Sequence, residues 1–308
     1  MTKLSFLIAA HNEEKIIANA LNNLIKLPYK NYEIIIGLDG CTDNTEEVIK
    51  KFQKNSKKIK YYKLSLRKGK PAVINSIIKK ASGDIVVIHD ADWIFKFNNK
   101  KILQEFLSVF NKKEVGGIAE SFPVEWDFQK LKKGNLGYKM VAHSSYFWFE
   151  FQKKRFAGKQ GNLIYLREPA MFLTNIFRKK LYKENASLGD DFERTYDIMG
   201  SKYKIVIFDS LNYPRMISSY GDISIKDLFK QKVRTAVARK QLKKSRNWKI
   251  NSKTFYIPIF IYMFKESLKK GLNVFFIISF WIFLSFLATI YASLKQINTR
   301  EGWSLRAR

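Results

Sequence analysis

Blocks of apolar residues alternate with amphipathic stretches along the first 95 residues of the chain. Between the apolar blocks, Ile17 and Leu21 belong to one stripe at helical spacing, and Ile74 and Ile77 belong to another that Pro71 suits as a first-turn residue. The alternation of strands and helices predicts an α/β fold with a mostly parallel sheet. Four short apolar runs, two of them nearly continuous and rich in Ile or Val as in strands buried on both faces, are the predicted strands: residues 4–10, 33–38, 60–66 and 84–88.

The middle of the chain gives a weaker pattern. Residues 101–110 and 189–200 have the periodicity of helices, and residues 204–208 have the pattern of a further strand. The rest of the segment 96–188 is rich in Lys and aromatic residues and is punctuated by glycines. We therefore expect mixed strands and loops over that segment.

Three segments of contrasting polarity follow. Residues 226–249 contain ten Lys or Arg and one acid, Asp227. Residues 254–264 are apolar, but eleven residues are too few to cross a bilayer, so we expect an interfacial or re-entrant helix. Residues 272–294 are 23 residues without a charge, and a helix of that length spans roughly 35 Å, enough to cross a bilayer. The alternative is a buried core helix, although helices of globular proteins seldom lack charges on every face.

Composition narrows the class of protein. With 308 residues, of which 46% are hydrophobic and 15% aromatic, the chain can bury a sizeable core, and this excludes wholesale disorder. The single cysteine, Cys41, excludes an intramolecular disulfide framework and a Cys-rich zinc site. Lys and Arg number 56 against 27 Asp and Glu, and the net charge of +29 favours a polyanionic partner: nucleic acid, an anionic membrane surface or a phosphorylated substrate.

These features divide the chain into four regions. We expect a catalytic domain over residues 1–225, a basic interfacial segment over 226–270, a transmembrane helix over 271–295 and a tail over 296–308. The basic run directly precedes the apolar segments, which favours contact with anionic lipid headgroups over a merely solvated helix face. Lys and Arg number fourteen over residues 226–271, before the span, and four over residues 295–308, after it, so the positive-inside rule predicts a catalytic domain in the cytoplasm. The tail would lie outside with a single span, or inside if residues 254–264 help to form a hairpin.

Polar stretches follow the predicted strands at the points where those strands should end. In parallel sheets ligands bind at the carboxyl ends of the strands, so these stretches should converge in one crevice. Asp90 and Asp92 are two residues apart, and on an extended chain both carboxylates then point to one face. Two carboxylates together with substrate phosphates suit Mg²⁺ or Mn²⁺, although turn carboxylates at a strand end give the same pattern. The stretches are residues 10–14, 39–45, 67–70 and 89–92.

The order of these stretches resembles family 2 glycosyltransferases with the GT-A fold, over roughly residues 3–240. Two positions depart from the family pattern: Cys41 replaces the usual Ser, and Thr235 replaces the Trp of the Gln-x-x-Arg-Trp motif found in membrane-bound members. The matching motifs are Asn12-Glu13, Asp39-Gly40-Cys41-Thr42-Asp43-Asn44-Thr45, Gly69-Lys70 with Asn75, Asp90-Ala91-Asp92, Gly189-Asp190-Asp191 and Gln231-Lys232-Val233-Arg234-Thr235.

This resemblance implies an enzyme that moves a sugar, with inversion, from a UDP- or GDP-linked donor to a membrane-associated acceptor such as a polyprenyl phosphate, a glycolipid or a glycan. Asp90 and Asp92 would hold the Mg²⁺ or Mn²⁺ that bridges the diphosphate, and Asp191 would be the general base. The helix dipole would keep Asp191 ionised and weaken it as a base, whereas neighbouring Asp190 acts in the opposite direction. The resemblance places the nucleotide sugar against Ala10, Asn12, Glu13, Asp39, Arg67, Lys70, Asp90, Gln231 and Arg234.

Three other functions fit part of the pattern. A processive polysaccharide synthase would need a channel of several transmembrane helices, whereas this chain has one clear span. A nucleic-acid-binding protein would suit the net charge, but no RNA- or DNA-binding motif occurs, so we do not expect nucleic acid as a partner. A catalytically inactive scaffold is disfavoured because the motif aspartates and Arg234 occur together. Glu120, Glu125 and Asp127 fit an acceptor-binding loop and a solvated loop equally well, and the oligomeric state is not specified.

Overall fold

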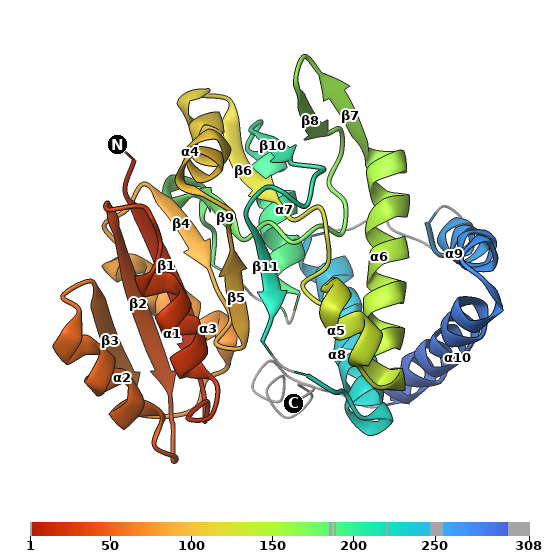
Figure 1. Ribbon diagram of the computed structural model, residues 1–308, viewed down its shortest axis with the longest axis horizontal. Helices are drawn as coiled ribbons and strands as arrows, with labels where there is room; N and C mark the ends of the chain where they lie inside the picture. The colour runs from red at the N-terminus through yellow and green to blue at the C-terminus, as the bar shows by residue number, and fades with distance from the viewer. Residues whose placement is uncertain (1, 185–186, 188, 220, 247–254, 295–308) are drawn as a thin grey trace.

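The computed structural model describes residues 2–184, 187, 189–219, 221–246 and 255–294 (Figure 1). The strands are β1 Leu4–Ala10, β2 Tyr32–Asp39, β3 Ile59–Leu64, β4 Ile85–Ile88, β5 Trp93–Lys96, β6 Val115–Ala119, β7 Ala157–Gln160, β8 Leu163–Leu166, β9 Ile176–Arg178, β10 Lys204–Ile207 and β11 Arg215–Ser218. The helices are α1 Ile17–Ile25, α2 Thr45–Asn55, α3 Lys70–Ile77, α4 Lys100–Ser108, α5 Phe128–Lys133, α6 Leu136–Phe156, α7 Asp190–Gly200, α8 Ile225–Arg246, α9 Ile257–Lys269 and α10 Leu272–Leu294.

Nine of the strands in the described part of the chain form one sheet in the order β3-β2-β1-β4-β9-β6-β10-β8-β7. β1 pairs in parallel with β2 and β4, β2 pairs in parallel with β3, and β6 pairs in parallel with β10. The antiparallel strand β9 lies between β4 and β6, and β5 pairs with β11 in a separate small sheet. The prediction of an α/β fold with a mostly parallel sheet is confirmed.

Both faces of the sheet are covered by helices, and this explains the continuous apolar runs in the sequence. In β1, Phe6 and Ile8 pack into a core that includes residues of α1, α2 and α4. Leu7 and Ala9 point to the opposite face and pack into a second core with residues of α3 and α6. All seven residues of β1 are therefore buried. The four predicted strands and the helices expected near residues 101–110 and 189–200 are confirmed, with ends that differ by at most two residues.

The segment 96–188 contains the largest departure from our expectation of mixed strands and loops. Residues 136–156 form α6, a helix of 21 residues. Successive residues such as Met140, Val141 and Ala142 are all buried, because α6 packs against α8, α9 and α10 and the core of the sheet at once. A helix that is buried on several sides lacks the single apolar stripe by which a helix is recognised in a sequence.

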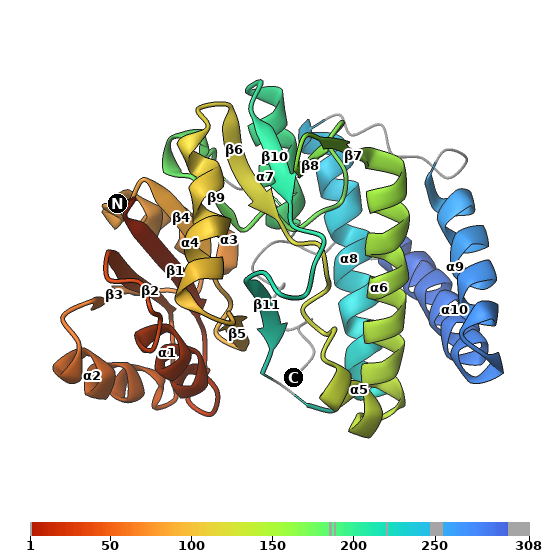
Figure 2. The same ribbon diagram turned by 45° about the horizontal axis from the view of Figure 1, so that its top comes forward.

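The three C-terminal helices pack onto the domain beside α6 (Figures 1 and 2). α10 runs antiparallel to α8: the rings of Phe229 and Tyr291 are 5.8 Å apart, and Lys240 and Ser279 line one cavity further along the pair. One stripe of α10 is buried against its neighbours, at Ile277, Ile278, Trp281, Leu284, Ala288 and Ala292. The large apolar residues exposed on α10 are Leu272, Phe276, Phe280, Phe283, Phe286, Leu287, Ile290, Tyr291 and Leu294.

The structure confirms that both apolar segments form helices, whereas their placement in or on a membrane stays a prediction. The 23 residues of α10 form one helix that is long and apolar enough to cross a membrane. The short apolar segment at 254–264 is helical from Ile257, as α9, whereas Thr254 and the tail 296–308 lie outside the described residues. The boundary at residue 225 stays a prediction.

Candidate active site

The carboxyl ends of β1, β2 and β4 lie side by side in the sheet, and the loops after β1 and β2 touch. Ala10 at the end of β1 is in register with Leu38 of β2, and β4 pairs along the other edge of β1. Asn12 adopts a left-handed backbone conformation with φ 55°, which Asn tolerates better than most residues. Its side-chain oxygen accepts the backbone N–H of Thr42 at 2.9 Å and so joins the first two loops.

The predicted positions Ala10 and Glu13 are buried beneath these loops. The Ala10 carbonyl accepts the thiol of Cys41 at 3.4 Å, and the Glu13 backbone N–H donates to the Thr45 hydroxyl at 2.7 Å. Burial raises the pKa of the Cys41 thiol, so this cysteine has the character of a structural turn residue. These contacts fix the start of α2 against the end of β1.

Asp39 organises the loop that follows β3. Its two carboxylate oxygens accept the backbone N–H groups of Lys68 at 2.7 Å and Gly69 at 2.8 Å, and the side chain is fully buried. Gly40, beside it, has φ 61°, and a Cβ there would lie 3.1 Å from the backbone nitrogen of Arg67. Arg67 itself is exposed on the loop. Asp39 therefore has a structural role that our sequence analysis did not anticipate.

A cavity of about 250 Å³ lies beyond the end of β4 and is bounded by the acidic motifs and by α8. We call it the catalytic cavity. The predicted positions Ala10, Asn12, Glu13, Asp39 and Arg67 do not line it and form a neighbouring group at the ends of β1, β2 and β3. The predicted positions that do line it are Lys70, Asp90, Asp92, Asp191, Gln231 and Arg234.

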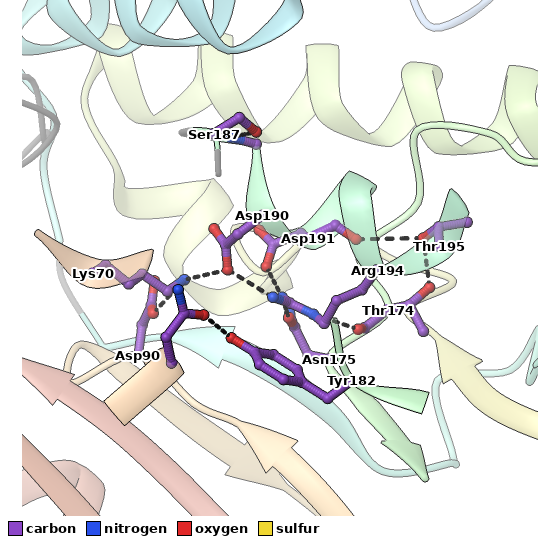
Figure 3. A network of polar contacts seen from close by, with 12 residues as sticks. Lys70, Asp90, Thr174, Asn175, Tyr182, Ser187, Asp190, Asp191, Arg194 and Thr195 are labelled. Carbon is purple, nitrogen blue, oxygen red and sulfur yellow. Dashed lines mark hydrogen bonds and ion pairs between the residues drawn. The ribbon is translucent and has the colours of Figure 1, made fainter. Parts of the chain in front are cut away.

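Lys70 connects the Asp90-Ala91-Asp92 motif to Asp190 at the start of α7. Its ammonium nitrogen lies 2.9 Å from a carboxylate oxygen of Asp90 and 3.8 Å from one of Asp190 (Figure 3). Burial by itself would lower the pKa of Lys70, but Asp190 and Asp90 raise it above its ordinary value, so the ammonium stays charged. The cation therefore sits among carboxylates at the wall of the catalytic cavity.

The first turn of α7 carries a buried network of charges (Figure 3). Arg194 pairs with Asp190 at 2.7 Å and also with Asp191, which lie four and three residues earlier on the same helix. Its Nε donates to the carbonyl of Thr174 at 3.0 Å, which ties α7 to the segment before β9. The arginine thus holds the two aspartates in fixed positions at the edge of the catalytic cavity.

The two neighbouring aspartates differ in their affinity for a proton. For Asp190 burial raises the pKa, but Lys70 and Arg194 outweigh it and hold the pKa below the ordinary value. Burial and the charge of Asp190 together raise the pKa of Asp191, against the opposing effect of Lys70. Asp191 lines the cavity, so the more basic of the two carboxylates is the one that faces the space.

Sequence reasoning missed several residues around this cavity. Arg194 was detectable, because its spacing from Asp190 and Asp191 places all three on one helical face. Arg239 and Trp281 also line the cavity, but they lie on α8 and α10, far along the chain from the strand-end motifs. No local pattern marks such residues.

The three acidic residues between β6 and α5 lie in different environments. Glu125 is buried and lines the catalytic cavity. Glu120 lies elsewhere, near Arg215, and burial raises its pKa to about 8 despite the opposing arginine. Asp127 caps the start of α5 by accepting the backbone N–H of Gln129 at 3.0 Å. Of the three, Glu125 is the one that lines the catalytic cavity.

The acidic residues fit a divalent cation that is shared with a substrate. Asp90 and Asp92 face the same cavity, as their spacing predicts, and carboxylate oxygens are the ligands that Mg²⁺ and Mn²⁺ prefer. No cluster of three or more His, Cys, Asp or Glu side chains suited to a metal occurs in the described ranges. Two protein carboxylates that are completed by phosphate oxygens and water are a normal site for Mg²⁺.

Comparison with known proteins identifies the family. The model of "Glycosyl transferase family 2" matches residues 5–180. The poly-beta-1,6-N-acetyl-D-glucosamine synthase of Staphylococcus epidermidis is 40% identical over 91 residues, which are 30% of this chain and 22% of that protein. The synthase of Staphylococcus aureus strain COL is 42% identical over 91 residues with the same coverage. The matched region is thus less than a quarter of the length of these curated relatives.

A solved structure supports the fold over nearly the whole chain. The mannosyltransferase PcManGT from Pyrobaculum calidifontis, solved with GDP-Man and Mn²⁺, superposes with a TM-score of 0.56 at 17% identity. The superposition covers 98% of this chain and 78% of that one. Because the family model spans more than half of the chain, the chain belongs to glycosyl transferase family 2 and is a glycosyltransferase of the GT-A fold.

Proposed function

We propose that the protein is an inverting glycosyltransferase that moves a sugar from a UDP- or GDP-linked donor to a membrane-associated acceptor. A divalent metal, Mg²⁺ or Mn²⁺, and a general base, Asp191, are part of the proposal. The observation that carries it is the meeting of three motifs in the catalytic cavity: Asp90 and Asp92 after β4, Asp191 on α7, and Gln231 with Arg234 on α8.

Different residues of the catalytic cavity would act on the leaving group and on the acceptor. A divalent metal, when bound, neutralises charge that develops on the leaving diphosphate. Asp90 and Asp92 would hold that metal, and Lys70 and Arg234 add positive charge on the cavity wall. Asp191 would accept the proton of the acceptor hydroxyl, for which its raised pKa suits it. A single base that acts opposite the leaving group gives inversion at the anomeric carbon.

The nucleotide is assigned to the group of residues next to the cavity. Asp39 holds the loop that carries Arg67, and Asn12 lies at the mouth formed by the first two loops. We propose that the base and ribose lie against this group, with Ala10, Glu13 and Asp39 as its floor. The diphosphate would then reach the catalytic cavity beside Lys70.

A processive polysaccharide synthase is the second candidate function, because the curated relatives that match a part of the chain carry that name. Polymer extrusion needs a channel of several transmembrane helices. The described residues contain one helix that is long and apolar enough to cross a membrane. The transfer of single sugars is therefore our preferred form of the proposal.

A donor screen tests the proposed function directly. The purified full-length chain should release UDP or GDP from one class of nucleotide sugar, in the presence of Mg²⁺ or Mn²⁺, and faster when a lipid extract is added. Release should be measured across UDP- and GDP-sugars with and without the metal. A chain that binds none of these donors and releases no nucleoside diphosphate under any combination would refute the proposal.

We also propose that α10 attaches the protein to a membrane, with the catalytic domain in the cytoplasm. The charge distribution supports this orientation, since Lys and Arg number fourteen over residues 226–271, before α10, and four over residues 295–308, after it. A protease added to sealed inverted vesicles should remove an N-terminal tag. A tag that stays protected until the vesicles are opened with detergent would show the opposite orientation.

A further inference from the structure

A second and larger cavity adjoins the catalytic cavity. It has a volume of about 830 Å³ and lies between α8, α9 and α10. Most of its wall is apolar, with Leu242, Tyr256, Phe260, Ile282 and Phe286 among the lining residues. We call it the apolar cavity, and a space of this size and character is typical of a ligand site.

The two cavities share a wall on which two cations lie. Lys232 and Arg239 of α8 line both spaces, together with Trp281 of α10. Lys232 lies 4.4 Å from the centre of the Trp281 ring, and Arg239 lies about as close to the rings of Trp148 and Tyr256. No carboxylate is ion-paired with either cation within the part of the chain that the structure describes.

Three hydrogen-bond donors that line the apolar cavity, two of them on the shared wall, also lack partners among the described residues. They are the Nε of Arg239, the indole N–H of Trp281 and the hydroxyl of Ser285. A buried donor without an acceptor costs free energy. Lys232 and Arg239 are half-buried and lie about two turns apart on α8, and two such cations without an ion-paired carboxylate add to that cost. Burial and Arg239 lower the pKa of Lys232 to about 7, against the opposing effect of Glu125. This wall therefore has the composition of a site for an anion.

The carboxylates lie on one side of this wall. The catalytic cavity is lined by the carboxylates of Asp90, Asp92, Asp191 and Glu125, whereas the apolar cavity is lined by none. Lys70 and Arg234 also line the catalytic cavity, and Lys70 is ion-paired with Asp90. A phosphate acting as the acceptor group would have to lie among these carboxylates to reach Asp191, whereas a neutral sugar hydroxyl meets no such repulsion. A phosphate held at Lys232 and Arg239 would instead stay at the shared wall, which borders the carboxylate-free apolar cavity.

We propose that the acceptor is a lipid-linked saccharide whose hydrocarbon chain lies in the apolar cavity, whose phosphate binds Lys232 and Arg239, and whose sugar reaches Asp191 in the catalytic cavity. This inference rests on the proposed function and names its acceptor. The phosphate serves as an anchor and takes no part in the reaction. The exposed Phe283 and Phe286 of α10 line the apolar cavity and provide an apolar exit for a longer chain towards the membrane.

Sugar transfer forms one glycosidic bond and breaks another. A hydroxyl oxygen of the acceptor sugar forms a bond to the anomeric carbon of the donor sugar, while the bond from that carbon to the diphosphate oxygen breaks. The hydroxyl proton passes to Asp191, and the electron pair of the broken bond leaves with the nucleoside diphosphate. The lipid phosphate is unchanged at the end.

Ligand binding to the full-length protein tests this site without any turnover. Trp281 lines both cavities and is 5% exposed, so its fluorescence should report the binding of a ligand. The probes are farnesyl phosphate that carries one N-acetylglucosamine, farnesol, and vesicles of phosphatidylglycerol. We expect the anionic prenyl sugar to bind at least about tenfold more tightly than farnesol, because charged hydrogen bonds are added. Equal affinities for the two prenyl probes would overturn the proposal.

Variants locate the phosphate and the chain separately. Lys232→Met and Arg239→Gln should each weaken binding of the prenyl sugar by about tenfold and leave farnesol binding nearly unchanged. Ser285→Phe, which fills the apolar cavity, should weaken both prenyl probes. The matched control is Lys226→Met, at an exposed position on the same helix, and it should bind like the wild type. An equal loss in the control and in the Lys232 variant would mean that only the general charge of α8 matters, and this would contradict the site.

Three further outcomes distinguish this acceptor site from a lipid-headgroup surface, from a phosphate nucleophile and from a failure of the proposed function. Competition by phosphatidylglycerol vesicles as strong as that of the prenyl sugar would show a general lipid-headgroup surface and overturn the assignment. If farnesyl phosphate without a sugar accepts the transferred sugar, the phosphate is the nucleophile and the anchor role is wrong. Tight, Lys232-dependent binding together with no release of nucleoside diphosphate from any sugar donor would refute the proposed function and leave the binding site standing.

Discussion

Replacement of Asp191 by Asn is expected to reduce sugar transfer by about 10²–10⁴-fold, the usual effect of losing a general base. The amide keeps the shape and the pairing geometry of the side chain but cannot accept a proton. Donor affinity should stay within a few-fold of the wild type, because the proposed nucleotide contacts lie at the ends of β1, β2 and β3 and at Lys70. Initial rates beside calorimetry of donor binding measure the two quantities separately.

A control on the same helix makes this test specific. Asp197 lies two turns further along α7, is buried and does not line the catalytic cavity, so Asp197→Asn should transfer at close to the wild-type rate. The pH profile adds a second check. Since the pKa of Asp191 is raised, the wild-type rate should fall on acidification at a higher pH than an ordinary aspartate would give. Near-normal turnover in Asp191→Asn, or a loss of donor binding in step with turnover, would make Asp190 the next candidate.

Replacement of Asp92 by Ala is expected to abolish transfer and leave the fold intact. Asp92 lines the catalytic cavity at the end of β4, and its removal halves the pair of carboxylates available to the metal. Without the metal, the charge on the leaving diphosphate loses its main stabilisation. Transfer rates with saturating Mn²⁺, together with a thermal unfolding curve, measure activity and fold.

The matched control for Asp92 is Asp84→Ala. Asp84 is exposed at the opposite end of the same strand, so this variant should keep both activity and metal dependence. Excess chelator should stop the wild-type enzyme and the control alike. Full activity of the wild type in excess chelator would show that transfer does not need a divalent metal.

The first half of the fold was predictable because its signals are local. Strands such as β1 are buried on both faces and therefore appear as unbroken apolar runs, and the stripe of α1 is continuous. α6 escaped prediction because Met140 and its neighbours are buried on several sides at once. The burial of α6 depends on α8, α9 and α10, which lie far along the chain. The sequence pattern within a short window of residues therefore does not indicate that burial.

Some residues of the candidate site were also predictable from local motifs, and others were not. Lys70, Asp90, Asp92 and Asp191 stand in motifs whose order resembles a known family, and the structure brings them to one cavity. The structural role of Asp39 was not predictable, because it depends on the backbone N–H groups of a loop some thirty residues away. Arg239 belongs to the basic face of α8, and only its packing beside α10 distinguishes it from a solvated arginine.

The central claim is that the cavity at the end of β4 holds a metal-bound nucleoside diphosphate. Its most direct test is the anomalous scattering of Mn²⁺ in crystals of the protein grown with Mn²⁺ and either UDP or GDP. The account predicts one strong peak within bonding distance of an Asp92 carboxylate oxygen and of the diphosphate, with the nucleoside lying towards Asp39 and Arg67. A diphosphate bound away from Asp90 and Asp92, or bound there with no manganese peak, would contradict it.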